Sequence, residues 1–168
     1  PGTGKSTVAS LLGDLGYRIE TVESLAEEFG CIEEVDPRDG ARPIDVDKLQ
    51  KNLEMAWEES PKGQTVIDGH LSHLLSVDCV VILRCRPEEL RERLAGRSYP
   101  SQKIDENVDW EILGGPWAEI EDGKPIIEFD TSCEKSESIV AAILKWVSDD
   151  FKPRCHRNPS DWVGKGEV

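Results

Sequence analysis

The chain opens on the segment PGTGKST, residues 1–7, which constrains its fold more than any other part of the sequence. Gly-Lys-Ser closes the Walker A pattern G-x-x-x-x-G-K-[ST], a loop that lies between a strand and a helix and wraps around phosphate groups. The full pattern also requires a glycine five residues before Gly4 and a strand that leads into the loop. We expect both to precede residue 1. The segment therefore predicts a phosphate-binding loop at the start of a helix.

Each residue of this loop has a chemical task. Gly2 and Gly4 let backbone N–H groups curl around phosphate oxygens, where the N-terminus of the following helix adds positive potential. Lys5 reaches the β- and γ-phosphates, and Ser6 offers its hydroxyl to Mg²⁺. The alternative is that Gly-Lys-Ser is only the chance start of a helix. The apolar helical pattern that follows at residues 8–15 favours the phosphate-binding loop.

Short apolar runs alternate with helical patterns along the rest of the chain. The sequence predicts strands at 17–22, 65–68, 79–83 and 126–129, and helices at 23–29, 45–59, 87–97, 102–113 and 136–148. Two of the strands, 65–68 and 79–83, are typical of fully buried strands of a parallel sheet. The alternation predicts an α/β fold, a parallel sheet with helices on both faces. We expect one domain over residues 1–150 and a partly disordered tail over 151–168.

A second candidate part of the site is the run VIDGH, residues 66–70. Asp68 ends a predicted strand, at the edge where ligands bind in open α/β sheets and where a Walker B acid holds Mg²⁺. Asp68 could instead cap the next helix. His70 could orient a water molecule or a phosphate, or bond to a neighbouring loop. His73 is expected on the surface.

Two arginines form the third candidate part. Arg93 and Arg97 are four residues apart, which predicts one face of a helix. Paired guanidinium groups at the mouth of a nucleotide site would clamp phosphates, with Arg93 as a ground-state contact and Arg97 at the hinge of a closing segment. The alternative is a solvated face paired with Glu89 and Glu92. The nearby phosphate-binding loop favours the clamp.

Charge and composition limit the partners. Lys and Arg number 20 against 34 Asp and Glu, a formal net charge of −14. Such a chain is not expected to bind nucleic acid sequence-specifically over its surface, because phosphate neutralisation needs clustered cations. A basic protein partner, or a small anionic ligand in a local positive pocket, is compatible with the charge. No apolar stretch approaches the ~18 residues that span a bilayer, so no membrane role is expected.

The cysteines and the first residues favour a cytoplasmic location. Five cysteines at irregular spacing, without a Cys-x-x-Cys pair, are typical of reduced thiols and not of a disulfide framework or a zinc site. Cys155 and His156 are the only Cys–His neighbours, and a metal role for them is not expected. The first residues lack the basic start and apolar run of a signal peptide.

The motifs GTGKST, VIDGH and ERLAGRSY…KIDENVDWEI resemble the adenylate kinase isoenzyme six family of archaea and eukaryotes, whose members are also described as ribosome-assembly nucleotide kinases. The Asp-x-His strand end and the Arg-Ser-Tyr…Lys-Ile…Glu-Asn…Glu-Ile run separate this family from ordinary adenylate kinases. The resemblance covers residues 1–148. It implies a P-loop NTPase core, an NMP-binding segment at about 22–45 and a very short lid at about 96–106.

The resemblance also implies residue roles and an activity. Carried over by position, Gly2, Gly4, Lys5, Ser6, Thr7 and Arg97 would contact ATP. The chemistry of the motifs themselves adds Arg93 as an ATP contact, Lys5, Asp68, His70 and Arg97 as catalytic residues, and Ser6 and Asp68 as Mg²⁺ ligands. Family members are held to be broad nucleoside monophosphate kinases with weak ATPase activity. They act in late small-subunit (16S/18S rRNA) maturation through a ribosomal protein or pre-ribosomal particle. The Gly-Gly-Pro-Trp connector at 114–117 departs from the family pattern, as do the first strand and first Walker glycine that the chain lacks.

Two functions of different classes are compatible with the sequence. The first is an enzyme that moves the γ-phosphoryl group of ATP to AMP by supplying position and charge. The second is a nucleotide-switched assembly ATPase, or chaperone, whose slow hydrolysis times the release of a basic partner such as a ribosomal protein. A kinase of another small metabolite would rest on the phosphate-binding loop alone.

Overall fold

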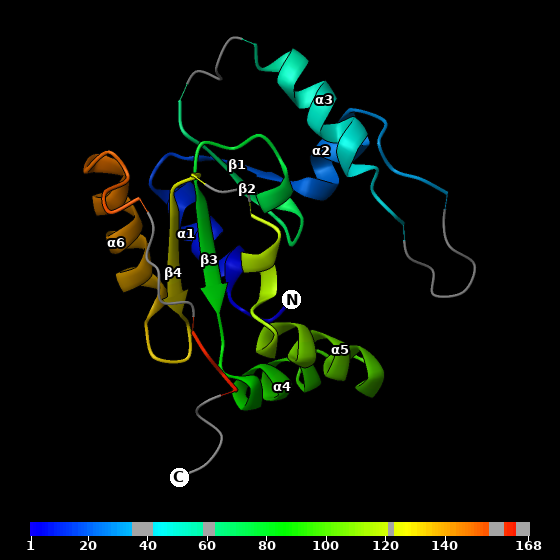
Figure 1. Ribbon diagram of the computed structural model, residues 1–168, viewed down its shortest axis with the longest axis vertical. Helices are drawn as coiled ribbons and strands as arrows, with labels where there is room; N and C mark the ends of the chain where they lie inside the picture. The colour runs from blue at the N-terminus through cyan, green and yellow to red at the C-terminus, as the bar shows by residue number, and fades with distance from the viewer. Residues whose placement is uncertain (35–41, 59–62, 121–122, 155–159, 164–168) are drawn as a thin grey trace. The chain divides into compact units, whose positions relative to one another are not determined.

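The alternation of strands and helices is present in the computed structural model, which confirms the α/β fold class (Figure 1). The chain divides into two compact units, one formed by Leu12–Val77 and the other by Pro1–Leu11 together with Asp78–Val168. Helix α1 (Lys5–Asp14) begins in the unit that contains Pro1–Leu11 and ends in the unit Leu12–Val77. The structure describes residues 1–34, 42–58, 63–120, 123–154 and 160–163.

The unit Leu12–Val77 contains one pair of parallel strands. β1 (Arg18–Thr21) pairs with β2 (Thr65–Asp68), and the register sets Thr21 opposite Asp68 at the carboxyl end. The unit's other described elements are α2 (Val22–Glu28), α3 (Val46–Ala56) and the 3₁₀ turn η1 (Ser72–Leu74). Helix α2 lies within one residue of its predicted bounds, and α3 ends three residues earlier than expected. The turn η1 was not predicted.

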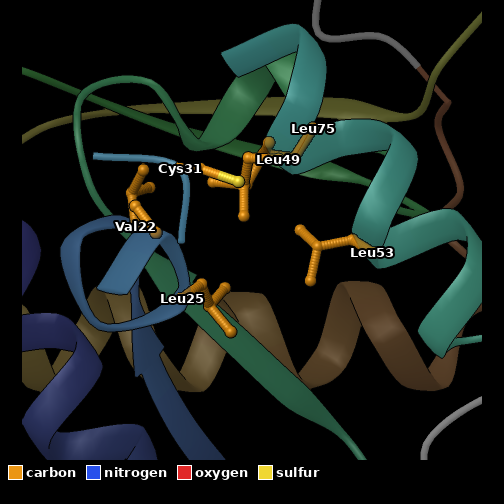
Figure 2. Close-up of a cluster of buried hydrophobic side chains, with 7 residues drawn as sticks. Val22, Leu25, Cys31, Leu49, Leu53 and Leu75 are labelled. Atoms are coloured by element: carbon orange, nitrogen blue, oxygen red, sulfur yellow. The ribbon is translucent and has the colours of Figure 1, made fainter. Parts of the chain in front are cut away.

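Apolar side chains from α2, α3 and the end of η1 form the core of this unit (Figure 2). Leu49 and Leu53, one turn apart on α3, are almost fully buried, and they pack with Leu25 of α2 and Leu75 after η1. This i, i+4 spacing is the one that predicts the buried face of a helix. Cys31 lies in the same cluster, which agrees with a thiol used for packing.

The helix starts of this unit are capped by side chains. Thr21 Oγ1 accepts a hydrogen bond from Ser24 N, and Ser24 Oγ accepts one from Thr21 N, both at 3.0 Å. Asp45 Oδ1 accepts from Lys48 N at 2.9 Å at the start of α3. These reciprocal bonds satisfy N–H groups that a helix leaves unpaired, so β1 turns into α2 without an intervening loop.

The other unit contains the second pair of parallel strands. β3 (Val80–Arg84) pairs with β4 (Ile126–Asp130), and Arg84 lies opposite Asp130. The helices are α4 (Pro87–Ala95), α5 (Ser101–Ile112) and α6 (Ser136–Ser148), with a 3₁₀ turn η2 (Gly115–Ala118). The predicted helix at 136–148 is confirmed at both ends.

Helices α4 and α5 form a hairpin with its own apolar core (Figure 1). Leu90 and Leu94 of α4 are nearly inaccessible to solvent, and they pack with Ile104 and Val108 of α5. The family-like run at 102–112 therefore supplies core residues. The segment 96–106, expected as the lid, comprises the turn after α4 and the first half of α5; its closure stays a prediction.

Two expectations about burial were wrong. β2 is only half-buried along its length, whereas β3 is buried at four of its five residues. His73 is buried at 6% exposure; it lies in the 3₁₀ turn η1, two residues before the core residue Leu75. In the described part of the tail, Arg154 O accepts from Ile126 N at 2.8 Å, and Trp162 is buried; the partial disorder of residues 151–168 stays a prediction.

Some expectations lie partly outside the described residues. The NMP-binding segment at 22–45 includes 35–41, and Cys155 and His156 also fall outside. The four described cysteines are free thiols, and burial, followed by the charge of Asp78, raises the pKa of Cys79 to about 11. None of the described helices has the length and apolar character needed to cross a bilayer.

Candidate functional site

The phosphate-binding loop turns directly into α1. Gly4 O accepts hydrogen bonds from Thr7 N and Val8 N, both at 3.1 Å, which starts the helix at the loop. Gly2 and Gly4 have φ angles of 85° and 90°. These angles lie in the left-handed region, which residues other than glycine rarely adopt. The resulting cradle of N–H groups at a helix N-terminus is the geometry that binds anionic oxygens.

The loop packs closely against α4, and this contact requires a glycine. A Cβ atom on Gly2 would lie 2.7 Å from Leu90 Cδ1 and 3.2 Å from Leu94 Cδ2. Since 2.7 Å is far below a normal carbon–carbon contact, a Cβ at residue 2 would require the Leu90 side chain or the loop to shift, in addition to the strain of the left-handed backbone. The buried leucines of the hairpin thus hold the loop in place from one side.

Arg93 binds the loop backbone. Its Nη1 donates to Gly2 O at 3.2 Å and to Thr131 Oγ1 at 3.0 Å. Its Nη2 donates to Thr131 O at 3.0 Å and to Glu89 Oε1 at 2.6 Å. The predicted pairing with Glu89 is therefore present, but the guanidinium also joins the phosphate-binding loop to the segment after β4.

Arg93 and Arg97 do not lie on one helix as expected, because α4 ends at Ala95. Gly96 caps the helix, and Arg97 lies in the following turn, where its N donates to Leu94 O at 3.0 Å. The Arg97 side chain is exposed. Arg97 lies at the start of the segment that is expected to close as a lid. Its contact with the phosphates of ATP stays a prediction.

The loop after β4 is a part of the site that sequence reasoning missed. Thr131 is its central residue: its N and Oγ1 donate to Arg84 O at 2.9 and 3.0 Å. Its methyl carbon Cγ2 would lie 3.7 Å from a Cβ on Gly4, so it is in ordinary contact range of the phosphate-binding loop. The only sequence signal was the position of the Asp-Thr-Ser run just after a strand, where open α/β sheets bind ligands.

Asp130 stabilises this loop as a carboxylate. Burial raises the pKa of Asp130, but hydrogen bonds from Ser132 N at 2.9 Å and Cys133 Sγ at 3.2 Å outweigh it, with help from the charge of Arg86. The pKa of Asp130 therefore lies below its ordinary value. An ionised Asp130 fixes the first residues after β4 and so helps to set the place of Thr131.

Behind this loop lies a fully buried ion network. Arg84, with 0% exposure, pairs with Glu111 at 2.6 Å and with Glu128 at 3.3 Å. Trp162 Nε1 donates to Glu111 Oε1 at 3.0 Å, and Trp117 Nε1 donates to Glu128 Oε2. Every charge in the network is paired and hydrogen-bonded. The network therefore holds β3, β4, α5 and the described part of the tail in a single arrangement.

Asp68 and His70 belong to the unit Leu12–Val77. Asp68 ends β2 and is half-buried, whereas His70 is exposed two residues later. Between them, a Cβ on Gly69 would lie 2.4 Å from Val22 Cγ2, so only glycine allows α2 to approach the end of β2 so closely. The Asp-Gly-His spacing thus reflects packing as well as chemistry.

The residues expected at a Mg²⁺ ion have suitable chemistry. Ser6 supplies a hydroxyl oxygen in the first turn of α1, and Asp68 supplies a carboxylate at a strand end. Mg²⁺ prefers hard oxygen ligands and uses one or two protein groups together with substrate phosphates. The described residues contain no cluster of three or more His, Cys, Asp and Glu side chains suited to a metal.

Comparison with known proteins agrees with this geometry. A family model described as "AAA domain" matches residues 1–114. The chain is 37% identical over 170 residues to a protein of Archaeoglobus fulgidus, covering 99% of this chain and 90% of the relative. It is 39% identical to a protein of Pyrococcus abyssi (92% and 83% covered) and 37% identical to one of Methanocaldococcus jannaschii (98% and 90% covered). Each of the three is named "Putative adenylate kinase".

Proposed function

The chain belongs to the adenylate kinase-like family of P-loop nucleoside monophosphate kinases, and we propose that it transfers the γ-phosphoryl group of ATP to AMP, with weak ATPase activity beside it. The observation that carries the proposal is the loop at residues 1–7, whose two left-handed glycines lead directly into α1. The loop is built on the unit that also supplies Arg93 and the segment after β4.

The chain's own residues would act mainly by position and charge. Transfer between two phosphates passes through a loose transition state, so little covalent help is needed. The loop amides and Lys5 would hold the β- and γ-phosphates, and Arg97 would neutralise charge on the transferring group when the lid closes. Ser6 would hold Mg²⁺, which neutralises phosphate charge when bound. A metal role for Asp68 is expected from its place at a strand end. His70 would orient the water of the slower hydrolysis reaction.

A coupled assay over a panel of nucleoside monophosphates tests the proposal. We expect ADP to form from ATP and AMP without release of free phosphate, in a reaction that requires Mg²⁺. The panel, with AMP, dAMP and CMP as acceptors, then ranks the substrates of the NMP site. Absence of acceptor-dependent ADP formation from all of them would contradict the kinase.

A nucleotide-switched assembly factor is the second candidate, favoured by the net charge of −14. An acidic surface attracts basic partners, and ribosomal proteins are basic. In this function a small-subunit ribosomal protein or pre-ribosomal particle would bind in the cytoplasm, and hydrolysis would time its release during rRNA maturation. Phosphate release that rises on addition of a basic ribosomal protein, with no AMP-dependent ADP formation, would identify this function.

A further inference from the structure

We infer that Arg93 and Thr131 are positioning residues that set the phosphate-binding geometry of the loop at residues 1–7, an inference that rests on the proposed kinase function. We call the group Gly2, Glu89, Arg93 and Thr131 the Arg93 clamp. Its bonds all lie within one unit: Arg93 donates to Gly2 O, to Thr131 O and Oγ1, and to Glu89. The two ends of the clamp, Gly2 and Arg93, are separated by 91 positions in the sequence.

The clamp determines where a loop amide points. A peptide unit is planar and trans, so its C=O and N–H groups face opposite ways. Because Arg93 Nη1 holds the carbonyl of Gly2 on the α4 side, the N–H of Thr3 in the same peptide faces away from α4. Among the residues that the structure describes, no acceptor bonds to that N–H. An oriented, buried N–H of this kind suits an anionic oxygen.

The clamp is anchored to the rigid core through Thr131. The Thr131 hydroxyl accepts from Arg93 Nη1 and donates to Arg84 O, so it uses both of its hydrogen-bonding functions. Arg84 is itself held at 0% exposure by Glu111 and Glu128. Valine at residue 131 would keep the shape and lose both bonds, whereas serine would keep the hydroxyl.

The bonding of Arg93 argues against its main role being a direct contact to the nucleotide. A guanidinium has five N–H donors, and four hydrogen bonds from Nη1 and Nη2 go to protein acceptors. With half-buried side chains at both Arg93 and Glu89, the ion pair between them holds the guanidinium plane in place. Arg93 would therefore act on phosphate through Gly2.

Hydrogen exchange in the nucleotide-free protein tests the clamp without relying on turnover. We expect Thr131→Val and Arg93→Lys to speed amide exchange in peptides covering residues 1–8, and Thr131→Ser to leave exchange near the wild-type rate. Arg91→Ala is the matched control, because Arg91 lies on the same helix but pairs with exposed Asp105 on α5. Unchanged exchange in both Thr131→Val and Arg93→Lys would overturn the inference.

Equilibrium binding of MgATP and of inorganic tripolyphosphate separates positioning from direct contact. Arg93→Lys removes a charge-assisted hydrogen bond to the loop, and Thr131→Val removes the hydroxyl that holds Arg93. Each change should weaken the binding of both ligands by the same factor, about tenfold. Loss of ATP binding with tripolyphosphate binding intact would show that Arg93 contacts the nucleoside, and would overturn the inference. If the wild-type protein binds MgATP but phosphorylates no monophosphate, the kinase proposal fails while these binding and exchange measurements still decide on the clamp.

Discussion

Arg84 on β3 and Glu111 at the end of α5 form a buried ion pair, with 2.6 Å between Nε and Oε1. The same guanidinium donates through Nη2 to the carbonyl of Glu111, also at 2.6 Å. One arginine therefore binds both the side chain and the backbone of the last turn of α5. Glu111 Oε1 also accepts from Cys85 N at 3.1 Å, which ties the start of the α4 segment to the same point.

Glu111→Gln should strongly destabilise the protein. The change leaves the buried guanidinium of Arg84 with Glu128 as its remaining charge partner in the network, and loss of one partner of a buried pair costs about 3 kcal/mol of unfolding free energy. Denaturant unfolding measures the loss. The control is Asp105→Asn, which breaks the exposed pair with Arg91 and should cost less than about 1 kcal/mol. Equal losses in the two variants would contradict a structural role for the buried pair.

Lys5→Ala should abolish phosphoryl transfer while the protein stays folded. Lys5 lies in the first turn of α1, where its ammonium contacts Thr3 Oγ1 at 3.5 Å, and its side chain lies outside the apolar core. Loss of the charge that holds the β- and γ-phosphates should lower turnover by at least about 100-fold. Steady-state kinetics and a thermal melt check both parts. Near-normal turnover would contradict the assignment of the phosphate-binding loop.

Asp68→Asn and His70→Ala should affect phosphoryl transfer and ATP hydrolysis differently. Asp68→Asn should weaken the dependence on Mg²⁺ and slow transfer to AMP and hydrolysis alike, because the carboxylate serves the metal. His70→Ala should slow hydrolysis more than transfer, because only hydrolysis needs a positioned water. Parallel assays of ADP formation and phosphate release, with Mg²⁺ varied, measure the split. Equal losses of both activities in His70→Ala would argue against a water-orienting role.

Arg97→Lys should lower the turnover number more than it weakens nucleotide binding. Lysine keeps the charge but loses the planar, two-pronged donor, and Arg97 is expected to meet the phosphates only when the turn after α4 closes. The expected loss is about 2–3 kcal/mol of transition-state stabilisation. Kinetics with ATP varied at fixed AMP measure it, with Arg91→Ala as the surface-arginine control. An unchanged turnover number would mean that Arg97 is only a surface charge and that the assignment of residues 96–106 as a lid is wrong.

Local patterns predicted most of the elements, because helices and strands depend on periodicities of a few residues. The strand at 65–68 and the helix at 136–148 have the predicted bounds, and the loop at residues 1–7 leads into a helix as its motif requires. The prediction that Arg93 and Arg97 lie on one helix was wrong for a local reason. Gly96 ends α4 one residue before Arg97, and spacing alone does not show where a helix stops.

The candidate site was predicted where its chemistry is local and missed where it depends on distant residues. Gly2, Gly4 and Lys5 were found because their tasks follow from their spacing. Thr131 was missed because its importance comes from Arg84, 47 positions away, and from Arg93, 38 positions away. Glu111 was noticed only as part of a family-like run, and its buried charge became evident from the fold.

The chemistry of the loop at residues 1–7 follows from local spacing, since glycines and a lysine at those positions direct the backbone and the charge over a single turn. The groups that hold that loop in place come together only in the folded protein. Gly2 meets Arg93, and Arg84 meets Glu111, only after β3, β4 and the α4–α5 hairpin have packed. The physical reason is that a pairing between two particular residues far apart in sequence leaves no periodic signal in the chain, whereas the buried face of a helix does.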